Sequence, residues 1–137
     1  MPLPFDPIES LIRSGGDFAT ASFIAETHDL TNRTLAPFAQ KLAITLRPEI
    51  NEASVYNHAF PYTNVYVTRT AFWRRPEIQR FLFEVTCSGE FIRLRWGDAP
   101  VMGIALNIFA APADIYRMSQ VGYRHASHNY TVEPARY

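Results

Sequence analysis

The side chains best suited to chemistry are four histidines, one cysteine and a few carboxylates. His125 and His128 lie three residues apart, a spacing that lets two imidazoles share one face of a helix and bind one metal ion. Residues 123–132, however, have an extended or irregular pattern, in which this spacing directs the two rings to opposite sides. His28 and His58 are distant in sequence. We therefore expect no metal site.

The cysteine and the carboxylates are weak candidates for catalysis. Cys87 is the only cysteine, so it forms no internal disulfide, and its neighbours predict a core position rather than an exposed, activated thiol. Glu84, Asp98 and Asp114 could act as general acids or bases. Glu84 has a simpler role as the ion-pair partner of Arg93, and Asp98 as a turn former. The sequence thus predicts no catalytic residue.

The sequence also contains no motif of a known catalytic or cofactor site. It has no glycine-rich phosphate loop, no nucleophile elbow, no HExxH and no CxxC. We therefore expect a protein that is not an enzyme and that binds no cofactor.

Composition describes one globular domain spanning residues 1–137. Hydrophobic residues make up 47% of the chain and charged residues 19%, and 13 basic residues balance 13 acidic ones. A neutral chain has no overall field that attracts nucleic acid or an anionic membrane. No segment approaches the roughly 20 apolar residues that span a bilayer, and the first residues lack a signal-peptide pattern. We expect a soluble protein made inside a cell.

The elements that would position these groups are predicted mainly as strands, and the clearest is a β-hairpin over residues 78–96. Apolar residues alternate on both sides of a Ser88-Gly89 turn, which is typical of paired strands. A two-residue turn pairs Glu84 with Arg93 on the opposite face. The alternating residues are Phe81, Phe83, Val85, Cys87, Ile92, Leu94 and Trp96.

The rest of the chain supports the same fold class. Asp6-Pro7 begins a short helix that Gly15-Gly16 ends. Further strands are predicted over residues 17–28, 65–73 and 102–108, and a long loop over residues 48–63. Residues 31–46 fit either a helix capped by Thr34 or a strand over 40–47, and we favour the strand.

We therefore predict a mainly β fold, an antiparallel sandwich or jelly roll with a short N-terminal helix. An α+β roll with a helix over residues 34–46 is the alternative.

The outer face of the hairpin mixes apolar residues with arginines, which is typical of the centres of protein interfaces. The predicted interface residues are Arg80, Leu82, Phe91, Arg93 and Arg95. We expect a structural or assembly protein that binds copies of itself or other particle proteins, such as a capsid-decorating (cement) or tail protein of a virus or bacteriophage. Its location would be the virion, assembled in the host cytoplasm. We expect no nucleic acid, membrane or small-molecule ligand.

The sequence also fits two other hypotheses about function. One is a cytoplasmic α+β ligand-binding domain or an isomerase- or cyclase-like enzyme, in which a buried Glu84 or Asp114 acts with a tyrosine or histidine in an apolar pocket. The other is an adaptor that binds a peptide by adding a strand to a sheet edge.

Overall fold

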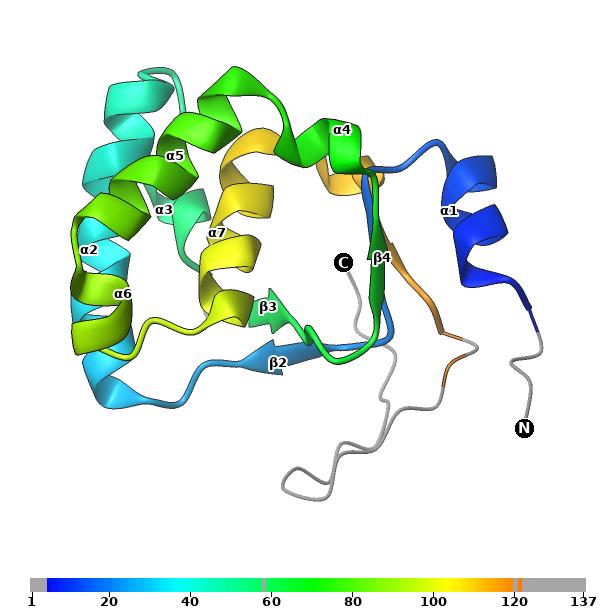
Figure 1. Ribbon diagram of the computed structural model, residues 1–137, viewed down its shortest axis with the longest axis horizontal. Coiled ribbons are helices and arrows are strands. Elements are labelled where there is room, and N and C mark those ends of the chain that lie inside the picture. The colour runs from blue at the N-terminus through cyan, green and yellow to red at the C-terminus, as the bar shows by residue number, and fades with distance from the viewer. Residues whose placement is uncertain (1–4, 58, 120, 122–137) are drawn as a thin grey trace.

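The protein is mainly helical, with two small sheets (Figure 1). A computed structural model describes residues 5–57, 59–119 and 121, so the predictions on His58, His125 and His128 lie outside the described residues. The helices are α1 (Pro7–Ser14), α2 (Asp29–Leu46), α3 (Glu52–Val55), α4 (Thr70–Trp73), α5 (Pro76–Cys87), α6 (Glu90–Arg93) and α7 (Asp98–Phe109), with a 3-10 turn at Pro112–Asp114. The strands are β1 (Phe18–Thr20), β2 (Phe23–Ala25), β3 (Ala59–Pro61), β4 (Tyr66–Thr68) and β5 (Ile115–Arg117).

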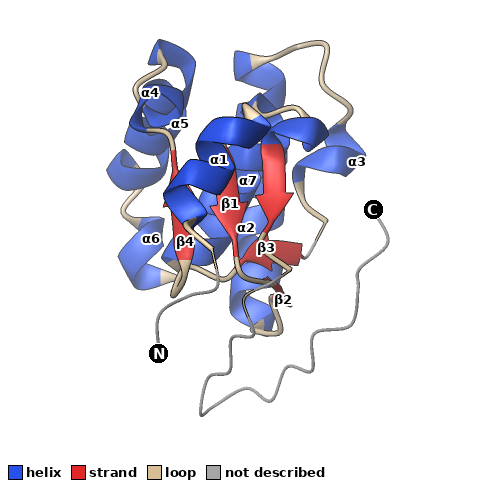
Figure 2. Ribbon diagram, turned by 90° about the vertical axis from the view of Figure 1, so that its right-hand side faces the viewer, coloured by secondary structure: helices blue, strands red, loops and turns tan. Residues whose placement is uncertain are grey.

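Strand β1 is the centre of the larger sheet, whose order is β4-β1-β5. β1 pairs antiparallel with β4 and parallel with β5, so that Phe18 lies opposite both Thr68 and Ile115. β2 and β3 form a separate antiparallel pair, with Ile24 opposite Phe60. Figure 2 shows α1 in front of the larger sheet and the other helices behind it.

The larger sheet therefore separates two apolar clusters. Phe18 points into the main core, which lies among α2, α5 and α7 and buries Phe60, Phe81 and Trp96 almost completely. Ala19 points to the other side, where it packs with Leu11 of α1 in a smaller cluster. This alternation along β1 is the period of two expected of a strand buried on both faces.

The predicted N-terminal helix is confirmed. The Asp6 carboxylate accepts hydrogen bonds from the backbone N–H groups of Ile8 and Glu9, at 2.8 and 3.2 Å. Pro7 occupies the first turn, and Gly15 ends the helix with a φ of 71°. Both end signals work as the sequence predicts, because they depend only on neighbouring residues.

The predicted hairpin over residues 78–96 is wrong, since this segment forms α5 and α6. Ile78, Phe81 and Val85 are buried on one helical face, whereas Phe83, which the alternation placed beside them, is 61% exposed. Gly89 has a φ of 68° and follows the end of α5, so the Ser88-Gly89 signal marks a helix terminus rather than a hairpin turn.

The strands predicted over residues 40–47 and 102–108 are also wrong. Residues 40–46 belong to α2, which accepts Pro37 within its length, and residues 102–108 belong to α7. The residues of α7 are buried nearly all round, so they show no amphipathic period that would distinguish a helix from a strand. The mainly β fold is therefore wrong, and the helix of the alternative roll is present only as part of α2.

The predictions for residues 17–28 and 48–63 have different outcomes. Residues 17–28 do contain two strands, β1 and β2, while the predicted loop over 48–63 contains α3 and β3. Within the described ranges, no helix has both the length and the apolar character needed to cross a membrane. The single-domain organisation stays a prediction.

Close packing of α7 on β3 depends on Gly103. A Cβ atom at this position would lie 2.3 Å from Cδ1 of the Phe60 ring, far inside van der Waals contact. Phe60 is fully buried, so its ring has no free space into which to move. Glycine at position 103 therefore sets the distance between the helix and the strand.

We expect Gly103→Ala to lower the free energy of unfolding by about 1–3 kcal/mol, because the new methyl group overpacks the core. Urea-induced unfolding measures this change. In a Phe60→Ala background the clashing Cδ1 and Cγ atoms are absent, so the added cost of Gly103→Ala should fall clearly below its cost in the parent protein. Equal costs in the two backgrounds would contradict the assigned contact.

Candidate functional site

A group of hydrogen-bonded polar side chains lies where β2 leads into α2. Asn32 connects three segments: its Nδ2 donates to the backbone oxygen of Glu26 at 3.0 Å, and its Oδ1 accepts from the Tyr56 hydroxyl at 2.6 Å. The Glu26 carboxylate accepts from the backbone N–H of His28 at 2.7 Å. We call this group, with Thr31, the α2 polar cluster; its members are Glu26, His28, Thr31, Asn32 and Tyr56.

The Thr31 hydroxyl determines which ring nitrogen of His28 carries the hydrogen atom. Its Oγ1 lies 3.1 Å from the backbone oxygen of Arg95 and 3.3 Å from Nδ1 of His28. A carbonyl oxygen only accepts, so the single hydroxyl proton goes to Arg95 and Nδ1 of His28 must be the donor to Thr31. The neutral ring then keeps its lone pair on Nε2, which bonds to no group in the described part of the chain.

Arg95 adds a strained backbone and a positive charge to the same region. Its φ of 56° is left-handed, a conformation that costs a residue with a side chain about 1–2 kcal/mol. The bond from Thr31 and the bond from Trp96 Nε1 to Thr34 Oγ1, at 2.8 Å, hold the segment against α2. Strain of this kind is common at functional sites. Among described residues, no carboxylate lies within ion-pair distance of its exposed guanidinium.

Tyr56 is the most perturbed group of the α2 polar cluster. Burial raises the pKa of its phenol from 10.0 to about 12, and the negative charge of Glu26 adds to the rise. The phenol is therefore a neutral donor throughout the physiological range. The hydroxyl and amide groups of the cluster bond to one another and to the backbone, so the acceptor that it offers to a ligand is Nε2 of His28.

The described residues contain no group of three or more histidine, cysteine, aspartate or glutamate side chains that could hold a metal ion.

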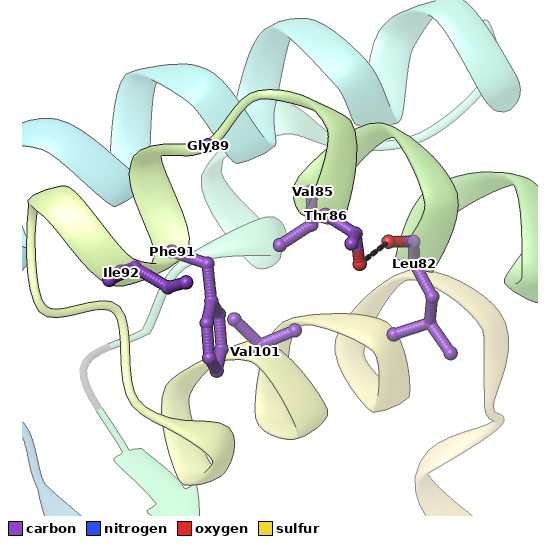
Figure 3. A pocket seen from close by; sticks show the side chains of 7 residues that line it. All are labelled: Leu82, Val85, Thr86, Gly89, Phe91, Ile92 and Val101. Atoms are coloured by element: carbon purple, nitrogen blue, oxygen red, sulfur yellow. Dashed lines mark hydrogen bonds between the residues drawn. The ribbon is translucent and has the colours of Figure 1, made fainter.

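A hollow lies between α5, α6 and the start of α7 (Figure 3). Its volume is about 180 Å³, and its lining is almost entirely hydrocarbon. The one hydroxyl, Thr86 Oγ1, already donates to the backbone oxygen of Leu82 at 2.8 Å, so it has no free proton for a ligand. This hollow, which we call the α5–α6 pocket, suits an apolar group rather than a sugar. It is lined by Leu82, Val85, Thr86, Gly89, Phe91, Ile92 and Val101.

The five predicted interface residues do not share one strand face. Arg80 and Leu82 lie on α5, Phe91 and Arg93 on α6, and Arg95 follows α6. Leu82 and Phe91 meet at the α5–α6 pocket, while the arginines have separate environments. Their role in an interface stays a prediction.

The other sequence candidates also have new surroundings. Glu84 pairs with Arg80 at 2.6 Å within α5, and Arg93 pairs with Glu90, so the predicted Glu84–Arg93 contact is wrong. Cys87 is exposed, contrary to the predicted core position. Asp98 begins α7 rather than forming a turn.

The backbone oxygen of Asp114 accepts a hydrogen bond from the N–H of Asp17 at 2.8 Å, which helps to align β5 with β1.

The sequence analysis did not predict Glu26, Thr31 or Asn32 as site residues. Their only local signal was Asp29, whose position after His28 is typical of a helix start.

Comparison with known proteins identifies the family of this chain. Residues 19–135 match the family model described as glycolipid 2-alpha-mannosyltransferase, a range that includes the whole α2 polar cluster. This range is most of the chain, so the protein belongs to the glycolipid 2-alpha-mannosyltransferase family.

Yeast relatives agree with this assignment. The chain is 32% identical over 75 residues to O-glycoside alpha-1,2-mannosyltransferase omh1 of Schizosaccharomyces pombe, covering 55% of this chain and 19% of the relative. It is 31% identical over 75 residues to glycolipid 2-alpha-mannosyltransferase of Saccharomyces cerevisiae, covering 55% and 17%. It is 28% identical over 131 residues to O-glycoside alpha-1,2-mannosyltransferase homolog 2 of S. pombe, covering 90% and 35%. The chain thus spans a minor part of the length of these relatives.

Family membership corrects the functional expectations. A family of mannosyltransferases contradicts the predicted virus or bacteriophage structural protein, the expectation that the protein is not an enzyme, and the predicted location in a virion. The absence of a glycine-rich phosphate loop, a nucleophile elbow, HExxH and CxxC therefore did not exclude an enzyme.

The pKa of Tyr56 gives a test of the α2 polar cluster. Because this pKa is raised above the value of the unfolded chain, its stabilising effect is complete below pH 10 and is lost as the pH rises toward about 12. We expect the parent protein to lose more stability over this range than Tyr56→Phe, which has no group to ionise. Urea unfolding at a series of alkaline pH values measures the difference, and parallel curves for the two proteins would contradict it.

Proposed function

We propose that the protein takes part in transferring mannose from an activated donor to a hydroxyl group of a mannoside acceptor, forming an α-1,2 linkage. The family match over residues 19–135 carries this proposal. The names of the yeast relatives supply the sugar and the linkage. Because the chain covers only part of those relatives, the activity of the chain itself is the point to be tested.

The reaction sets the chemical needs of the site. The acceptor oxygen forms a bond to C1 of mannose while the bond from C1 to the leaving phosphate oxygen breaks, and the proton of the acceptor hydroxyl passes to the released phosphate or to water. The site must therefore hold several neutral hydroxyl groups in fixed positions and must tolerate negative charge on the leaving group.

The α2 polar cluster contributes one hydrogen-bond acceptor to the first need. The lone pair on His28 Nε2 can accept a proton in a hydrogen bond from a sugar hydroxyl, and Thr31 holds the ring in the tautomer that presents it. Asn32 and Tyr56 are already bonded to each other, so they support the site rather than bind the sugar directly. The exposed guanidinium of Arg95 is a charge suited to phosphate.

The experiment offers the purified protein mannose on a nucleoside diphosphate and, separately, on a polyprenyl phosphate, with methyl α-mannoside as acceptor. Mass spectrometry detects an acceptor lengthened by one mannose, and NMR identifies the linkage. We expect an α-1,2-linked product with one of the two donors. Absence of product with both donors contradicts the proposal.

A pair of variants tests the role of the α2 polar cluster. We expect His28→Ala to lower kcat/KM by about tenfold, since losing one hydrogen bond to the sugar costs about 1.4 kcal/mol. Lys41→Ala is the control, because Lys41 is exposed on α2; this variant should react at the parental rate. If both variants keep the parental kcat/KM, His28 does not bind the sugar.

A further inference from the structure

Two tripeptides of the chain match Asn-x-Ser/Thr, the acceptor sequence for N-linked glycans. They are Asn32-Arg33-Thr34 and Asn129-Tyr130-Thr131, and neither has proline in the middle. The second lies outside the described residues, whereas the first lies in the first turns of α2. The fold around Asn32 therefore decides when this asparagine can receive a glycan.

Helix α2 separates the two side chains that the acceptor sequence must present together. The motif specifies both residues, so a glycosylating enzyme needs the asparagine amide and the threonine hydroxyl at the same time. Successive residues of an α-helix are rotated by about 100°, so the side chains of Asn32 and Thr34 point about 200° apart. They lie on nearly opposite sides of α2. The acceptor sequence is thus unreadable while this turn stays helical.

The amide of Asn32 is also bonded on both of its polar atoms. Its Nδ2 donates to the backbone oxygen of Glu26 at 3.0 Å, and its Oδ1 accepts from the Tyr56 hydroxyl at 2.6 Å. Tyr56 is only 7% exposed, so its hydroxyl cannot follow the amide out to an enzyme. Both bonds must break before Nδ2 can react.

The hydroxyl of Thr34 is held equally firmly. Its Oγ1 donates to the backbone oxygen of Leu30 at 2.6 Å, one turn earlier in α2. The same oxygen accepts from Trp96 Nε1 at 2.8 Å, and the Trp96 side chain is almost completely buried. Recognition of Thr34 by an enzyme therefore requires the core contact of α2 with Trp96 to open.

We propose that Asn32 is an N-glycosylation site of the unfolded chain, which folding of α2 closes. The donor is an oligosaccharide carried on a lipid diphosphate. Nδ2 forms a bond to C1 of the first sugar while the bond from C1 to the diphosphate oxygen breaks. The proton lost by Nδ2 passes to a base of the enzyme, and the lipid diphosphate leaves. Modification at Asn32 then reports how long the chain stays unfolded in the presence of the donor.

The test uses the full chain carrying Thr131→Ala, which leaves Asn32 in the one remaining acceptor tripeptide. A purified oligosaccharyltransferase and a lipid diphosphate-linked oligosaccharide supply the glycan, and mass spectrometry of the peptide containing Asn32 measures the modified fraction. The unfolded reference adds Ala39→Pro, since Ala39 is fully buried inside α2 and proline breaks a helix interior. Circular dichroism confirms its loss of helix. We expect the folded protein to be modified about a hundredfold more slowly than this reference, or slower still.

Two further variants sharpen the test. Thr34→Ala in the unfolded reference is the matched control, because it removes the acceptor sequence and should abolish modification. Leu11→Ala weakens the smaller cluster, which lies on the other side of the larger sheet from α2. We expect it to raise the modification rate by the same factor as the unfolded fraction, which urea unfolding measures independently.

Three results would overturn the proposal. The folded protein could be modified as fast as the Ala39→Pro reference, or that reference could remain unmodified at Asn32. The third is a modification rate that stays constant in Leu11→Ala although the unfolded fraction rises, since the folded chain would then be the acceptor. None of these results bears on mannosyl transfer, so this proposal and the proposed function are tested independently.

Discussion

Helix α7 can lie directly on strand β3 only because residue 103 has no side chain. The Phe60 ring fills the place where a Cβ atom of residue 103 would be, so the helix and the strand approach as closely as their backbones allow. Nearly every residue of α7 is buried, and the main core forms around it from α2, α3 and α5. The position of α7 in turn sets the path of the preceding segment, which carries Arg95 and Trp96 to the start of α2.

That path connects the core to the α2 polar cluster. Thr31 and Thr34 of α2 bond to Arg95 and Trp96, so the segment that enters α7 is held against the helix that carries Asn32. Tyr56, which follows α3, closes the cluster through its bond to Asn32. The cluster thus joins parts of the chain that are distant in sequence, and a change in the packing of α7 would reach it through Arg95.

The parts of the fold that the sequence predicts correctly are those with local causes. Asp6, Pro7 and Gly15 define α1 because cap bonds and backbone preferences involve only nearby residues. Phe81 and Val85 led to the wrong prediction of a β-hairpin, because their spacing fits both a period of two and a helix. Only their burial in the core shows that the helix applies. The α2 polar cluster could not be predicted, since Tyr56 and Asn32 are neighbours only in the folded chain. Membership of the glycolipid 2-alpha-mannosyltransferase family was likewise not predicted, because the likeness to the family is spread over residues 19–135.

We propose that this protein binds mannosides at the α2 polar cluster and not in the α5–α6 pocket. Backbone amide NMR during addition of α-1,2-mannobiose tests it most directly, because every described residue except proline reports on its own surroundings. We expect chemical-shift changes concentrated around His28 and Asn32. Changes confined to the α5–α6 pocket, or no changes at saturating sugar, would contradict it.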